Sequence, residues 1–236
     1  MQKVEFKTQE LPYNFNEEIK HLIAKLQFSG EEKKVILVTS SFEDEGKSTI
    51  TLELARSLAS IGKNFLLVDA DMRKSVLADN LVSTDESVNS LRGLSHLLSG
   101  QGKIEDILCQ TETPGCFVIF SGRVPPNPSE LLSGERMNVF VKWAKGKFDY
   151  VFIDTPPVNV VVDAAVIAPV CDGSILVVKA EAVPRKAVQN ALRQMEKTKC
   201  PILGVVLNQI RTDGGGKYYY KKYGYYKKYG YYKHEK

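Results

Sequence analysis

Short apolar runs alternate along this chain with longer stretches in which apolar residues recur at helical spacing. The short runs are rich in β-branched residues and predict six strands: Val35–Thr39, Phe65–Asp69, Cys116–Phe120, Tyr150–Asp154, Ser174–Val178 and Ile202–Leu207. The longer stretches predict helices over Lys47–Ser60, Ser90–Leu98, Ser129–Lys145, Val162–Ala168 and Arg185–Thr198. Most strand runs are apolar at nearly every position, which is typical of strands covered on both faces. The pattern predicts an α/β domain with a mostly parallel sheet and helices on both faces.

Two segments flank this domain, which is expected to cover residues 28–211. Residues 1–27 begin with polar positions and continue into a helical pattern over Asn16–Leu26. After Arg211 comes Thr-Asp-Gly-Gly-Gly, which has the composition of a flexible linker. Residues 212–236 then continue as a Tyr/Lys repeat without Leu, Ile or Val, so this tail is expected to be disordered.

The composition excludes several classes of protein. With 43% apolar and 25% charged residues, the chain is neither collagen-like nor disulfide-rich nor wholly disordered. No apolar run reaches the roughly 18–20 residues that cross a bilayer, and the first residues lack the apolar stretch of a signal peptide. We therefore expect a soluble, intracellular chain. Four cysteines without a CxxC pair argue against a zinc site and for buried, reduced thiols.

The positive charge of the chain is concentrated in its tail. From Lys217 onward, seven Lys against one Glu give a net charge of +6, so residues 1–216 carry −2 of the total +4. A nucleic-acid-binding domain is expected to spread its basic residues over a folded face. This distribution disfavours nucleic acid as a partner, although aromatic residues interleaved with Lys are also a pattern that stacks on bases.

A phosphate-binding loop follows the first predicted strand. The sequence Ser41-Phe-Glu-Asp-Glu-Gly-Lys-Ser-Thr matches the Walker A pattern, with Ser41 in place of the first Gly, and an apolar helix follows it. Such a loop directs backbone N–H groups at a phosphate, and the helix N-terminus adds partial positive charge. The sequence therefore predicts a P-loop NTPase-like fold; the alternative is an ordinary strand–helix turn. The predicted nucleotide-binding residues are Ser41, Glu43, Asp44, Glu45, Gly46, Lys47, Ser48 and Thr49.

Acidic residues end two further predicted strands. Asp154 closes an apolar strand and is a candidate Walker B residue, its alternative role being that of a capping Asp. Asp69 closes another strand, with Asp71 two residues later and on the same side of an extended segment. Two carboxylates beside bound nucleotide can divide their work, one holding Mg²⁺ and the other accepting a proton from an attacking hydroxyl. The alternative is a solvated acidic loop.

Together these motifs resemble those of the bacterial tyrosine kinases of capsule and exopolysaccharide synthesis. The residues that carry the resemblance are Ser41–Thr49, Leu66–Arg73 and Val151–Pro157, the stretch Pro-Pro-Asn-Pro-Ser-Glu-Leu-Leu after Val124, and the closing tyrosine cluster. The resemblance covers the chain from Asn16 onward. The family's A-prime motif has the form D-x-D-x-R, which Asp69, Asp71 and Arg73 reproduce.

The resemblance implies an ATP- and Mg²⁺-dependent protein-tyrosine autokinase. It assigns Lys47 to the phosphates, Ser48, Asp71 and Asp154 to Mg²⁺, and Asp69 to the role of base, although the roles of Asp69 and Asp71 can be exchanged. Asn208 resembles the adenine-contacting Asn of related ATPases, or is a strand-end turn residue. The acceptors that the resemblance implies are the tail tyrosines Tyr218, Tyr219, Tyr220, Tyr223, Tyr225, Tyr226, Tyr229, Tyr231 and Tyr232.

The resemblance also implies partners. Chains of the Gram-positive type are held at the inner face of the membrane by a separate transmembrane activator, a polysaccharide co-polymerase, and phosphorylate other proteins. Neighbouring copies are expected to exchange tails. The family's E-x-x-R-x-x-R self-association motif is altered here to Glu17, Lys20 and Ile23, which puts a ring-shaped oligomer in doubt. Partitioning-type ATPases share the fold, but their signature lysine is replaced by Phe42.

Overall fold

All the strands that the structure describes belong to one sheet. The computed structural model describes residues 2–6, 13–78, 81–83 and 92–210. Its strands are β1 (Gln2–Phe6), β2 (Val35–Ser40), β3 (Phe65–Asp69), β4 (Leu81–Ser83), β5 (Cys109–Thr111), β6 (Cys116–Ile119), β7 (Tyr150–Asp154), β8 (Gly173–Lys179) and β9 (Ile202–Asn208). Their spatial order is β4-β1-β5-β6-β3-β7-β2-β8-β9.

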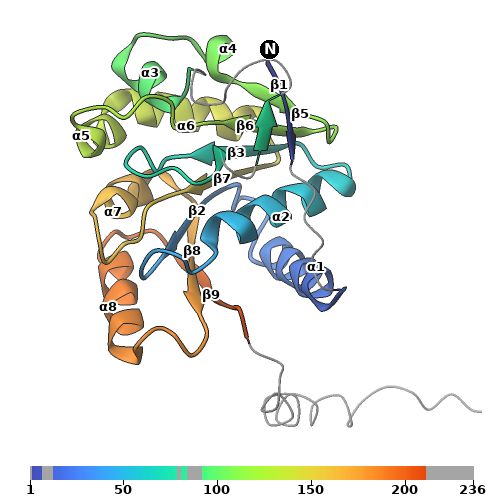
Figure 1. The fold of residues 1–236 in the computed structure, drawn as a ribbon, viewed down its shortest axis with the longest axis vertical. Coiled ribbons are helices and arrows are strands. Elements are labelled where there is room, and N and C mark those ends of the chain that lie inside the picture. Colours follow the sequence, from blue (N-terminus) through green and yellow to red (C-terminus); the bar gives the residue numbers. More distant parts are fainter. Residues whose placement is uncertain (1, 7–12, 79–80, 84–91, 211–236) are drawn as a thin grey trace, which may run out of the picture.

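The helices lie in two layers, one on each side of this sheet (Figure 1). They are α1 (Tyr13–Phe28), α2 (Lys47–Ser60), α3 (Leu94–Ser99), α4 (Ile104–Ile107), α5 (Pro128–Ser133), α6 (Glu135–Lys147), α7 (Asp163–Ile167), the 3-10 turn η3 (Ala168–Val170) and α8 (Arg185–Glu196). Helices α1 and α2 cover one face, whereas α3 and α5 to α8 cover the other. Among the described residues, none of these helices combines the length and apolar character needed to cross a bilayer.

The strands in the centre of the sheet are parallel. Strands β6, β3, β7, β2, β8 and β9 pair in parallel, and the antiparallel pairs are β1 with β4 and β5 with β6. In β2, Val35 and Leu37 pack under α6 to α8, while Ile36 and Val38 pack under α1 and α2. Successive side chains of a strand point to opposite faces, so a sheet covered on both sides needs continuous apolar runs. The predicted fold class is confirmed.

Some elements differ from the prediction. Strands β1, β4 and β5 were not predicted, because segments of three to five residues with polar members carry too little of the period-2 pattern. The single helix predicted over Ser129–Lys145 is two helices, since Gly134 adopts an extended conformation (φ −76°, ψ 161°) between α5 and α6. Helix α3 begins later than predicted, and α8 ends two residues earlier.

Helix α1 belongs to the packed structure. Its residues Ile19, Ile23 and Leu26 are buried against the α2 face of the sheet. Glu17 and Lys20 form an exposed pair along the helix, with 2.8 Å between Lys20 Nζ and Glu17 Oε1. Ile23, which stands at the last position of the altered self-association motif, is therefore a core residue of this chain rather than a surface one.

Candidate active site

The conformation of the phosphate-binding loop is stabilised by hydrogen bonds within the loop. Strand β2 ends at Ser40 and α2 begins at Lys47. The buried carboxylate of Glu45 accepts hydrogen bonds from the backbone N–H groups of Ser41 (3.0 Å) and Phe42 (3.1 Å). Burial raises the pKa of Glu45, and these two hydrogen bonds act against the rise. Gly46 is left-handed (φ 84°), and a Cβ there would lie 2.2 Å from Asn208 Nδ2, so the position requires glycine.

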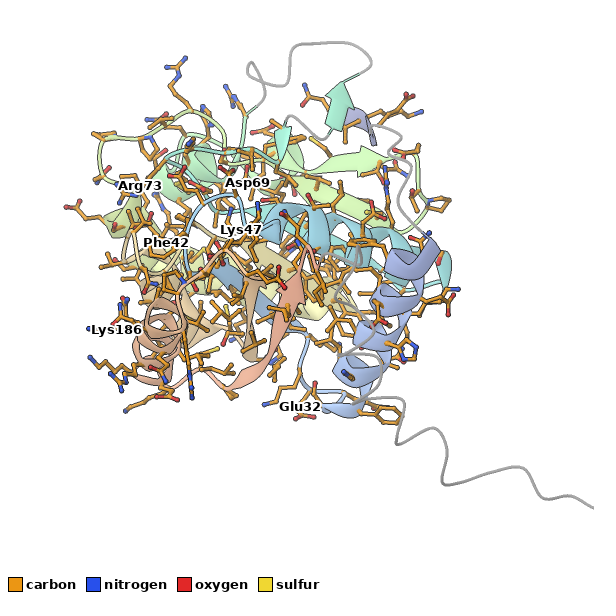
Figure 2. The ribbon with its side chains drawn as sticks, turned by 60° about the horizontal axis from the view of Figure 1, so that its bottom comes forward. Glu32, Phe42, Lys47, Asp69, Arg73 and Lys186 are labelled. Atoms are coloured by element: carbon orange, nitrogen blue, oxygen red, sulfur yellow. The ribbon has the colours of Figure 1, made fainter. Side chains whose placement is uncertain are left out.

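Three neighbouring strands bring the predicted motifs together. The loop follows β2, Asp69 ends β3 and Asp154 ends β7, and the order β3-β7-β2 makes these strands adjacent. Asp69 and Asp154 face each other in the register of β3 and β7. In Figure 2, Lys47 and Asp69 are labelled near the middle of the view, Phe42 and Arg73 to one side of them, and Glu32, which precedes β2, near the lower edge. Parallel strands place their carboxyl ends at one edge, where α/β proteins bind ligands.

Ser48 and Asp154 form the polar centre of the site. Ser48 Oγ donates to Asp154 Oδ2 at 2.5 Å, and both residues are buried. Burial raises the pKa of Asp154, while the nearby Lys47 ammonium and the Ser48 hydrogen bond act to lower it. Among the described side chains, Asp154 Oδ1 is a buried polar atom without a hydrogen-bond partner, as is Ser41 Oγ. A buried carboxylate oxygen without a donor is suited to a cation.

Asp69 and Asp71 have different environments. Asp69 is almost completely buried and accepts hydrogen bonds from the Asp71 N–H (3.1 Å) and from the Ser75 hydroxyl. Burial, with smaller contributions from Asp154 and Asp71, raises the pKa of Asp69 to about 7. Asp71 Oδ1 accepts from the N–H groups of Arg73 (3.2 Å) and Lys74 (2.9 Å). The structure thus brings Lys47, Ser48, Asp69 and Asp154 together, with Asp71 beside them.

Other predicted residues lie at the rim or outside the described part of the chain. Asn208 Nδ2 donates to the Glu45 carbonyl at 3.0 Å, which ties the end of β9 to the loop. Glu43 is exposed and pairs with Lys74, with 2.6 Å between Glu43 Oε2 and Lys74 Nζ. Asp44 has a positive φ of 59° at the turn of the loop. The predicted tail disorder and all nine acceptor tyrosines fall outside the described residues.

A buried carboxylate next to the site was not predicted. Asp163, at the start of α7, is fully buried and binds the Arg73 guanidinium, with 2.7 Å between Arg73 Nε and Asp163 Oδ2. Ser129, on α5, donates to Asp163 Oδ1 at 2.6 Å. One signal for Asp163 is present in the sequence, because it interrupts the apolar run from Val158 to Val170 and a buried acid needs a partner.

The residues present fit a nucleotide with Mg²⁺. The glycine-dependent loop, the helix N-terminus at Lys47 and the donor-free Asp154 oxygen are the features that such a ligand uses. Within the described residues, no cluster of three or more His, Cys, Asp or Glu side chains is arranged to hold a metal by itself. This agrees with Mg²⁺, which usually takes one or two carboxylates and completes its shell with phosphate oxygens and water.

The fold and this loop define the class of protein, a P-loop NTPase. A family model described as "ParA: NUBPL iron-transfer P-loop NTPase" matches residues 31–215. The tyrosine-protein kinase CpsD of Streptococcus agalactiae is 43% identical over 199 residues, which cover 84% of this chain and 85% of that protein. CpsD of Streptococcus pneumoniae is 40% identical over 206 residues, covering 86% and 89%. The kinase domain of the Escherichia coli tyrosine kinase ETK superposes with a TM-score of 0.78 at 27% identity, over 98% of this chain and 87% of that domain.

Within that class, the chain belongs to the bacterial tyrosine kinases of capsule synthesis. The resemblance that the sequence motifs predicted is confirmed, and the chain is a protein-tyrosine autokinase that acts in capsule and exopolysaccharide synthesis. The alternative of a partitioning ATPase is replaced by this assignment, although the shared P-loop fold explains the description of the family model.

Proposed function

We propose that the chain binds Mg²⁺-ATP on the loop Ser41–Thr49 and phosphorylates the tail tyrosines of a neighbouring copy. The observation that carries the proposal is that Ser48, in the first turn of α2, contacts Asp154 at the end of β7, which pairs with Asp69 at the end of β3. When bound, Mg²⁺-ATP supplies the phosphoryl group and the divalent charge that offsets the charge developing during transfer. Every other part of the chemistry is then positioning and proton transfer by groups of this chain.

The proposed roles follow from the environment of each group. Lys47 binds the phosphates, and Ser48, Asp71 and Asp154 hold Mg²⁺. Asp69 accepts the proton of the acceptor phenol, since a carboxylate with a pKa of about 7 is matched to proton transfer near neutral pH. Asn208 binds the adenine edge, and its present bond to the Glu45 carbonyl keeps it beside the loop.

The setting in the cell is also proposed. A transmembrane activator holds the chain at the inner face of the membrane and contributes a cytoplasmic segment to the nucleotide site. Copies of the chain meet there and exchange their tails. We base this on the family to which the chain belongs and on its basic tail, which carries +6 from Lys217 onward.

The test is mass spectrometry of the purified full-length chain after incubation with ATP and Mg²⁺, alone and with its activator. We expect phosphate on tail tyrosines and its loss, by at least about 100-fold, in Lys47→Met, because electrostatic stabilisation of the transferred phosphoryl group is a dominant contribution to catalysis. Lys63→Met, at a half-buried position between α2 and β3, is the control and should label like the wild type. Release of inorganic phosphate without phosphotyrosine, with the activator present, would contradict the proposal.

A further inference from the structure

The Pro-Pro-Asn-Pro-Ser-Glu-Leu-Leu stretch of residues 125–132 lies outside the phosphate-binding loop. Its Ser129 lies on α5 and contacts Asp163, which begins α7. Helices α5 and α7 pack against each other, and Leu132 and Ala164 are both buried in the same core. The stretch therefore packs against α7 beside the site and is not part of the nucleotide-binding loop.

Arg73, the last residue of the D-x-D-x-R motif, is hydrogen-bonded to residues of both α5 and α7. Its Nε donates to Asp163 Oδ2 at 2.7 Å, and its Nη2 donates to Asp163 Oδ1 at 3.1 Å. Nη2 also reaches Ser129 Oγ at 2.9 Å, and Ser129 itself donates to Asp163 Oδ1. The guanidinium is held by a two-point fork, a geometry that lysine cannot reproduce.

The same residue is bonded to Asp71 through its backbone. The N–H groups of Arg73 and Lys74 both donate to Asp71 Oδ1, so the position of the Asp71 carboxylate depends on the path of the chain at 73–74. The fully buried carboxylate of Asp163 stabilises this backbone path by binding the Arg73 guanidinium. It also lies at the end of the segment that leaves β7 after Asp154. One bonded cluster thus connects the segments after β3 and β7.

We propose that Asp163 and Ser129 are positioning residues for the kinase reaction, which lock Arg73 so that Asp71 is held in place for Mg²⁺. The inference rests on the proposed function in one respect, the role of Asp71 as a metal ligand. Partners of a ligating carboxylate control its orientation, and their removal typically costs about 10- to 100-fold in metal affinity or activity. The proline-rich stretch would then contribute to the reaction through Ser129, which helps to position Arg73.

The experiment compares Arg73→Lys, Ser129→Ala and Asp163→Asn with the wild type in the full-length chain. The first readout is the Mg²⁺ concentration that gives half-maximal autophosphorylation, and we expect it to rise about tenfold or more in Arg73→Lys and Asp163→Asn. The second readout does not depend on activity: the affinity for a fluorescent ADP analogue, measured in EDTA and in Mg²⁺. Affinity in EDTA should equal that of the wild type, whereas the gain on adding Mg²⁺ should shrink.

Arg56→Lys is the matched control. Arg56 pairs with Glu53 on α2, about two and a half turns from Lys47, so this substitution also changes an Arg–carboxylate pair and should leave both readouts unchanged. Arg73→Lys combined with Ser129→Ala should cost less than the product of the single effects, because the residues share one network.

The outcomes are distinguishable. If Arg73→Lys keeps the wild-type Mg²⁺ dependence in both readouts, or lowers kcat without changing that dependence, the positioning role is wrong. Wild-type Mg²⁺ dependence in Ser129→Ala would exclude Ser129 from that role. Should Asp163→Asn fail to fold, the other two variants decide, since they leave the buried carboxylate in place. Absence of Mg²⁺-dependent phosphotyrosine in the wild type would instead contradict the proposed function.

Discussion

At the scale of single residues, each carboxylate of the site has a distinct environment. Asp154 accepts a hydrogen bond from Ser48 at one oxygen, and its other oxygen has no donor among the described residues. Asp69 is satisfied at both oxygens, by the Asp71 N–H and by Ser75. Asp71 Oδ1 accepts hydrogen bonds from two backbone N–H groups, those of Arg73 and Lys74. Their residue types could be predicted from the sequence, whereas the partners that separate their roles depend on the folded geometry.

The pKa of Asp69 predicts how stability depends on pH. Burial raises it from 3.8 to about 7, so between these values the folded chain binds more protons than the unfolded chain. Its contribution to the free energy of unfolding is complete below the lower value and is lost as pH rises through about 7. In the metal-free and nucleotide-free protein, stability should therefore fall from about pH 5 to about pH 8, as measured by urea denaturation.

Asp69→Asn is the test of this pH dependence. The amide does not titrate, so the slope should become shallower, although not zero, because burial also raises the pKa of Asp154. An unchanged slope in Asp69→Asn would show that other groups produce the effect. Far-UV circular dichroism of both proteins at each pH confirms that a folded state is being compared.

At the scale of elements, the site depends on three adjacent parallel strands and the segments that leave them. Strand predictions for β2, β3 and β7 were accurate to within one residue, because buried parallel strands have continuous apolar sequences. The short strands β1, β4 and β5 were missed, since they form by pairing with other segments of the chain. The break between α5 and α6 was missed as well, because it depends on the extended backbone conformation of Gly134. Asp163 contacts Arg73 and, because α7 packs on α5, also Ser129.

Helix α1 gives a prediction at this scale. Ile23 is buried between α1 and the α2 face, so Ile23→Ala should lower the free energy of unfolding by about 2–4 kcal/mol, the usual cost of a cavity in a core. Lys20→Ala, on the exposed side of the same helix, should change it by less than about 0.5 kcal/mol, as surface pairs do. Urea denaturation of the two variants measures both values, and equal costs would contradict the burial of Ile23.

At the scale of the whole molecule, residues 1–216 and the tail from Lys217 onward carry opposite net charge. Residues 1–216 sum to −2 and the tail to +6. Each phosphate adds about −1.5 to −2, so three or four phosphotyrosines neutralise the tail and nine reverse its charge. Phosphorylation is therefore expected to change how strongly copies of the chain attract each other's tails, and this change should weaken at high salt.

Transfer between copies can be tested by mixing two variants. A chain truncated after Gly216 keeps the described site but has no tail acceptors, and full-length Lys47→Met has the acceptors but lacks the phosphate-binding lysine. If transfer occurs between chains, the mixture with the activator, ATP and Mg²⁺ should place phosphotyrosine on Lys47→Met, as detected by immunoblot. Lys47→Met alone is the control, and a mixture that stays unlabelled while the wild type is labelled would contradict transfer in trans.

The fold class, the order of the main elements and the segments of the three nucleotide motifs could all be predicted from the order of residues along the chain. These features are local: a period of apolar residues, a loop of given length and a carboxylate at a strand end. The three-dimensional arrangement was needed to find that Glu45 is hydrogen-bonded to the loop, that Ile23 is a core residue, and that Asp163 and Ser129 contact Arg73. Those contacts join segments far apart in the chain or depend on side-chain direction, which a pattern of residue types does not contain.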